Sequence, residues 1–105
     1  MAYLVNLEEF LKLGINTVFC KYEPFVVDEM QIKGESLSND FYVLDLDNLG
    51  SDNYIKYMEV LESGGNIEFD LHCQSRDACF KPEQQFLVFD NADVQRIINR
   101  LKECI

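Results

Sequence analysis

Carboxylates at two-residue spacing are the first feature of the chain that could do chemistry. Asp45 and Asp47 form one pair, and Glu68 and Asp70 form a second pair that His72 follows at the same spacing. Carboxylate and imidazole groups are suitable ligands for divalent cations. A small metal-dependent hydrolase that uses the four carboxylates is therefore one interpretation of the chain. No glycine-rich phosphate loop or basic substrate clamp accompanies them, so we expect no bound metal or cofactor.

The cysteines and the one histidine do not form a recognisable site in the sequence. His72 stands beside Cys73, but a structural zinc site needs four ligands in paired short spacings, which the chain lacks. In an extended segment, side-chain alternation places these two neighbours on opposite faces. The sequence has no serine-nucleophile, Walker or dinucleotide-binding motif. We assign no catalytic residue, and we expect a protein that is not an enzyme.

Negative charge is the most informative property of the sequence. Nineteen Asp and Glu face nine Lys and Arg, which gives a net charge of −10 over 105 residues. Residues 34–75 hold nine of the acids and only Lys56 as a base, so this segment alone carries −8. Such a field opposes nucleic acid, which must be bound by cations, and attracts a basic protein. Tyrosines within acidic surroundings suit the centre of a protein interface. The predicted partner-binding residues are Tyr42, Asp45, Asp47, Asp52, Tyr54, Glu59, Glu62, Glu68 and Asp70.

The elements that must position these residues predict an α+β fold. Asn6 followed by Glu9 has the spacing of a helix cap, Gly14 suits the end of that helix, and Asp90 or Asn91 suits the start of the last one. We expect a single domain, 1–105, with about three helices packed on one face of a mostly antiparallel sheet of about five strands, in the order α-β-β-β-α-β-β-α. Alternation places the carboxylates on the sheet face away from the helices. The expected helices and strands span 7–13, 15–22, 25–33, 41–47, 51–62, 67–73, 85–89 and the stretch after residue 90.

The compartment follows from what the sequence lacks. The start of the chain has no basic region followed by a long apolar one, and no apolar run approaches the length of a membrane span. A chain of this size can bury one core without disulfides. We therefore expect a cytoplasmic protein with four reduced cysteines and no membrane contact.

In size, acidity and the absence of an export signal, the chain resembles bacterial immunity proteins, including those of contact-dependent growth inhibition systems. The resemblance implies a one-to-one complex with a cognate toxin domain, often a basic nuclease, whose active site or nucleic-acid groove the acidic face would cover. It rests on no residue motif and carries over no site residue. A second interpretation is a phage-type counter-defence protein, such as an anti-CRISPR or anti-restriction mimic of DNA, whose carboxylates imitate phosphates.

Overall fold

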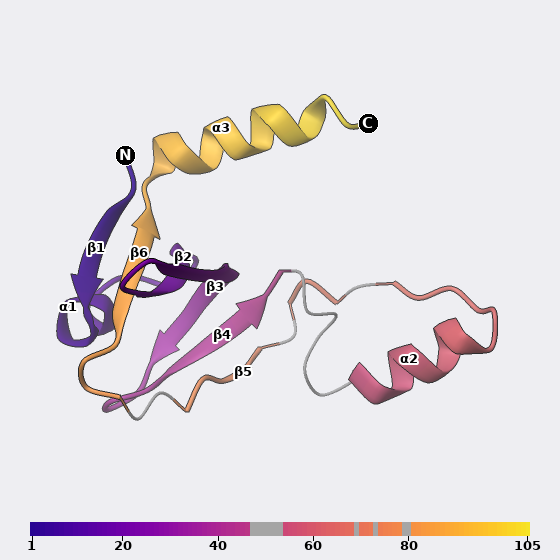
Figure 1. Cartoon of the computed structure of the whole chain (residues 1–105), viewed down its shortest axis with the longest axis horizontal. Coiled ribbons are helices and arrows are strands. Elements are labelled where there is room, and N and C mark those ends of the chain that lie inside the picture. The colour runs from indigo at the N-terminus through magenta and orange to yellow at the C-terminus, as the bar shows by residue number, and fades with distance from the viewer. Residues whose placement is uncertain (47–53, 69, 73, 79–80) are drawn as a thin grey trace.

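Six strands form one antiparallel sheet in the computed structural model, which describes residues 1–46, 54–68, 70–72, 74–78 and 81–105. The strand order across the sheet is β1-β6-β2-β3-β4-β5 (Figure 1). The α+β class is therefore confirmed, with six strands in place of about five. In chain order the elements are β1 (Tyr3–Asn6), α1 (Leu7–Leu11), β2 (Val18–Glu23), β3 (Val26–Ser36), β4 (Phe41–Asp45), α2 (Tyr54–Glu62), β5 (Ser75–Arg76), β6 (Gln85–Phe89) and α3 (Asn91–Lys102).

Two strands differ from the prediction. The sequence pattern missed β1, a four-residue strand whose last residue, Asn6, also caps α1. The strand predicted at 67–73 is wrong, because the described residues of that range belong to no strand. There Asp70 Oδ1 accepts a hydrogen bond from the backbone N–H of His72 at 2.9 Å, which stabilises a turn. The edge strand comes later, at Ser75–Arg76, and pairs with β4.

Helix α1 covers one face of the sheet through a single fully buried side chain. Asn6 Oδ1 accepts from the backbone N–H of Glu9 at 2.8 Å, which confirms the predicted cap. The helix ends at Leu11, two residues before the predicted end, and the left-handed backbone that follows it falls at Asn16 (φ 67°), not at Gly14. Phe10 is 0% exposed and points into the sheet.

Four fully buried phenylalanines form the centre of the core beneath α1. The Phe10 ring stacks on Phe86 at a centroid distance of 4.0 Å, and it meets Phe19 and Phe41 edge-on at 4.6 and 4.9 Å. Edge-on and stacked arrangements are the favourable geometries of aromatic pairs. Since the four rings come from α1, β6, β2 and β4, this cluster joins the helix to three strands.

Lys33 of β3 is buried beside this cluster, at 1% exposure. Its ammonium donates to Ser36 Oγ at 2.7 Å and to the Gly34 carbonyl at 3.1 Å, and it lies 5.7 Å from the centre of the Phe10 ring. Ser36 Oγ in turn donates to the Leu11 carbonyl at the end of α1, at 2.6 Å. The Ser36 hydroxyl therefore joins the end of α1 to β3. Loss of hydration in this position lowers the pKa of Lys33 below its usual 10.5.

Because Lys33 is buried, its charged form lowers the free energy of unfolding by an amount that depends on pH. When a folded-state pKa lies below the unfolded value, the unfolded chain holds the proton more tightly, and stability rises as the pH climbs from the folded pKa to 10.5. We expect Lys33→Met, which keeps the apolar stem, to raise the free energy of unfolding by about 1 kcal/mol at neutral pH. Urea titrations should show this gain shrinking toward pH 10.5. Lys12→Met, at the exposed residue that follows α1, should show no such trend. A loss of stability at neutral pH in Lys33→Met would contradict this prediction.

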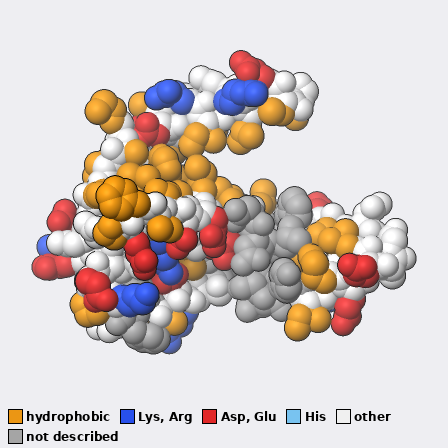
Figure 2. Space-filling model, in the orientation of Figure 1, with side chains coloured by type: hydrophobic (Ala, Val, Ile, Leu, Met, Phe, Trp, Pro, Cys, Tyr) orange, Lys and Arg blue, Asp and Glu red, His pale blue; other side chains and the backbone are white. Residues whose placement is uncertain are grey.

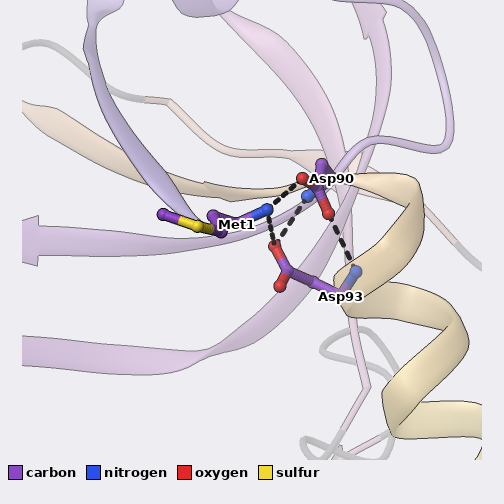
Figure 3. Close-up of polar contacts among 3 residues, drawn as sticks. All are labelled: Met1, Asp90 and Asp93. Carbon is purple, nitrogen blue, oxygen red and sulfur yellow. Dashed lines mark hydrogen bonds and ion pairs between the residues drawn. The ribbon is translucent and has the colours of Figure 1, made fainter.

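The last helix, α3, begins at a closely bonded group of charges (Figure 3). Asp90 caps it, with Oδ1 accepting from the backbone N–H of Asp93 at 2.8 Å, while Asp93 Oδ2 accepts from the backbone N–H of Asp90 at 3.1 Å. The Met1 ammonium donates to Asp90 Oδ2 and lies 3.5 Å from Asp93 Oδ2. That hydrogen bond lowers the pKa of Asp90 to about 2 and raises the pKa of the Met1 amino group. The start of α3 is thereby fixed to the start of the chain.

The expectation that all helices pack on one sheet face is wrong. Of the described helices, α1 alone covers the sheet in this way, whereas α2 and α3 project from it as separate elements, both toward the right of the view in Figure 1. The radius of gyration is 15.2 Å, compared with about 13 Å for a compact domain of this length. The two projecting helices bring their side chains out to surfaces that a compact domain would cover.

Candidate protein-binding surface

Two buried carboxylates at the sheet, Asp40 and Asp77, are paired with cations. Asp40 is 1% exposed and lies 3.1 Å from Arg76 Nε, and Asp77 is 5% exposed and lies 2.7 Å from Lys21 Nζ. Partners at such distances offset the cost of burying a charge. These acids therefore stabilise the sheet and its edge, and they are not free to meet another protein.

Two of the predicted binding residues, Tyr42 and Asp45, belong to β4 and point to opposite faces. Asp45 lies at the end of a cross-strand row with Phe19 and Gln31, on the face that α1 covers. It accepts a hydrogen bond from the buried Gln31 Nε2. Its predicted place on the face away from the helices is wrong. Tyr42, three residues earlier, points to the other face and lines a hollow with Gly34 and other residues.

A second set of predicted residues stands apart from the sheet. We name residues 54–68 and 70–72, which comprise α2 and the segment after it, the acidic arm. Glu59 and Glu62 on α2 are exposed, and so are Glu68 and Asp70, which lie together at one hollow with Leu71 and His72. Among the described residues, none of these four carboxylates forms an ion pair. With Lys56 as its one base, the arm carries a net charge of −3.

Figure 2 places acidic side chains of the arm at the end of the molecule farthest from α1. The structure therefore brings Glu68 and Asp70 together, and it places Glu59 and Glu62 on the neighbouring helix. It does not bring Asp45 or Tyr42 into one surface with them. The predicted residues Asp47 and Asp52 lie outside the described residues, and so does the side chain of Tyr54.

The arrangement offers little support for a metal-dependent reaction. Within the described ranges, no group of three or more His, Cys, Asp or Glu side chains is placed to hold a metal ion. Asp45 belongs to the sheet and is bonded to Gln31, whereas Glu68 and Asp70 belong to the acidic arm. His72 shares an open hollow with these two carboxylates.

An apolar cleft beside α3 is a feature that the sequence alone did not reveal. Val94, Ile97, Ile98, Leu101 and Ile105 recur at helical spacing in the sequence, which is typical of a helix face that packs on a sheet. None of the described residues of α3 is buried. A hollow of about 500 Å³ lies between the helix and the end of β6, lined by Phe89, Asp93, Arg96, Ile97, Arg100 and Leu101. Periodicity identified the apolar face but could not show that it stays uncovered.

Comparison with known proteins gives no assignment: no family model, no curated protein and no solved structure matches the chain. Across the ranges that the structure describes, every helix is too short or too polar to cross a bilayer. The function must therefore be argued from the surfaces themselves.

Proposed function

We propose that this protein is an acidic inhibitor that binds a basic protein partner, in the manner of an immunity protein that neutralises a cationic nuclease toxin. The observation that carries the proposal is the group of exposed, unpaired carboxylates on one projecting segment. The buried Asp40 and Asp77 beside the sheet each have a cation within 3.1 Å, whereas exposed acids of β3 such as Asp28 and Glu29 form no ion pair with a described residue. In the acidic arm, four exposed carboxylates have no cation from the described residues, and the arm projects away from the sheet.

Unpaired carboxylates on a projecting segment suit the surface of a nuclease. A nuclease must attract phosphates with lysines and arginines, so its substrate groove is cationic. Acidic side chains that are not already neutralised steer such a partner toward the complex and pair with its cations on contact. Like charges gathered without a partner repel one another, so a complex would relieve a cost that the free protein bears.

Partner choice and compartment follow from the same argument. The partner would be the nuclease domain of one cognate toxin, and the acidic arm would cover its active site or nucleic-acid groove. The place of action would be the cytoplasm, where thiols such as the buried Cys20 stay reduced. The arm would act by blocking access, with no chemical step of its own.

The test is to mix the chain with the nuclease toxin domain encoded beside its gene. We expect an equimolar complex on a sizing column and loss of nuclease activity at equal concentrations. Unrelated basic nucleases at the same ionic strength serve as the control, and they should remain active. A toxin domain that neither binds nor loses activity would remove the proposal. Inhibition of several nucleases in competition with DNA would instead support a mimic of DNA.

A further inference from the structure

The apolar stripe of α3 is only partly covered, with Val94 and Ile97 half-buried and its other members exposed. Ile98 is 41% exposed and Leu101 is 61% exposed, although both are large aliphatic side chains. Exposing one such residue is ordinary, but a continuous stripe on a projecting helix indicates an interaction surface. Figure 2 shows an open cleft beneath the helix with hydrophobic side chains on both of its walls.

The sheet face opposite α1 is apolar as well, and we name it the second face. Two cross-strand rows lie on it, and their members share an aliphatic, sulfur or aromatic character: Leu4, Leu87, Cys20 and Met30 in one, and Phe89, Val18, Ile32 and Leu44 in the other. Leu4 is 45% exposed and Leu87 and Phe89 are half-buried, whereas Cys20 and Leu44 are buried. A face of this composition normally packs against another layer of structure. The helix that could supply the layer, α3, stands away from it (Figure 1).

The accessible surface area of the chain is larger than that expected for a compact monomer. The chain exposes 7461 Å², whereas a folded monomer of 12.2 kDa exposes about 6,100 Å². The excess of roughly 1,400 Å² belongs to the whole chain, the acidic arm included, and it compares with the ~800 Å² that each partner buries in a standard protein–protein interface. The chain therefore exposes more surface than a compact monomer, by an amount that could include one interface of standard size.

The charges of α3 indicate which kind of protein could bind its apolar face. Helix α3 carries Arg96, Arg100 and Lys102 against Asp93 alone, in a chain whose other residues hold most of its acids. Two of these cations, Arg96 and Arg100, line the apolar cleft, and Arg100 also lies 3.2 Å from Glu103 in an exposed ion pair. The helix therefore complements an acidic apolar surface and repels a basic protein. A second copy of this chain, with its net charge of −10, meets this requirement. The basic protein proposed as the partner of the acidic arm does not.

We propose that α3 packs against a second copy of this chain, with the apolar stripe of each helix lying on the second face of the other copy. The arrangement is isologous, because each copy gives the same helix and receives it on the same face. The proposal does not depend on the acidic arm, whose carboxylates lie on a different part of the chain.

The experiment is a measurement of mass in solution for the full chain and two variants. At tens of micromolar, multi-angle light scattering should give twice 12.2 kDa for the unchanged protein. Leu101→Asp places a charge in the stripe and should give the monomer mass. Asn99→Asp adds the same charge on the polar side of α3, next to its hydrogen bond with Gln95, and should remain dimeric.

Loss of the dimer must be distinguished from loss of the fold. Leu101 is 61% exposed, so its replacement should leave the circular dichroism spectrum unchanged. Arg100→Glu tests the charge argument without touching an apolar side chain, and it should weaken the dimer at least tenfold at low salt. A monomeric unchanged protein, or a dimer that both Leu101→Asp and Arg100→Glu leave intact, would overturn the proposal.

Discussion

Phe10→Ala is expected to lower the free energy of unfolding by about 3–5 kcal/mol, the usual cost of truncating a buried phenylalanine. Phe10 is the one fully buried residue of α1, and its ring contacts the three other phenylalanines of the core. The five-residue helix is too short to be stable by itself, so its attachment depends on this contact. Net stabilities of small domains are about 5–15 kcal/mol, so the variant should unfold at a much lower urea concentration.

The matched control for this prediction is Phe25→Ala. Phe25 is 101% exposed at the turn between β2 and β3, so the same truncation there removes no buried surface. We expect a change within about 0.5 kcal/mol, as for most surface substitutions. Urea unfolding of both variants, followed by circular dichroism, makes the comparison. Equal losses in the two variants would show that the aromatic cluster is not the centre of the core.

Reversing the two glutamates of α2 is expected to have the largest effect on binding. Glu59→Lys with Glu62→Lys changes the net charge of the acidic arm from −3 to +1. Electrostatic steering changes association rates by roughly 10- to 1,000-fold, so the association rate with a basic nuclease domain should fall at least tenfold at low salt. Surface plasmon resonance measures it. The difference should shrink as added salt screens the charges.

A control must separate the effect of where the charges lie from the effect of the total charge of the chain. Glu8→Lys with Glu103→Lys makes the same change in net charge at two exposed positions outside the arm. If the arm is the binding surface, this control should slow association only slightly. Equal slowing in both double variants would mean that the overall charge attracts the partner and that the acidic arm has no special role.

Local features of the fold could be predicted from the sequence because their causes are local. The cap of α1 depends on Asn6 and a backbone N–H three residues later, and β6 was predicted with the bounds that the structure has, Gln85–Phe89. Helix α3 follows from the capping residue Asp90 and the apolar stripe after it. Each of these elements is specified by neighbours within one or two turns of chain.

Features that depend on distant partners could not be predicted in this way. Alternation in 67–73 resembles a strand, but a strand needs an adjacent edge with which to pair, and β4 pairs with Ser75–Arg76. The side of the sheet on which Asp45 lies was fixed by Phe41 and Val43, which pack under α1. The sequence also could not distinguish carboxylates that find a cation, such as Asp40 and Asp77, from those of the acidic arm that do not.

Hydrogen exchange of the chain, free and in complex with the basic nuclease domain, tests most directly whether the acidic arm is the partner-binding surface. If the partner binds the arm, exchange should slow in residues 54–68 and 70–72 of the complex, with α3 and the second face unchanged. Slower exchange in α3 with no change in the arm would show that the partner binds elsewhere.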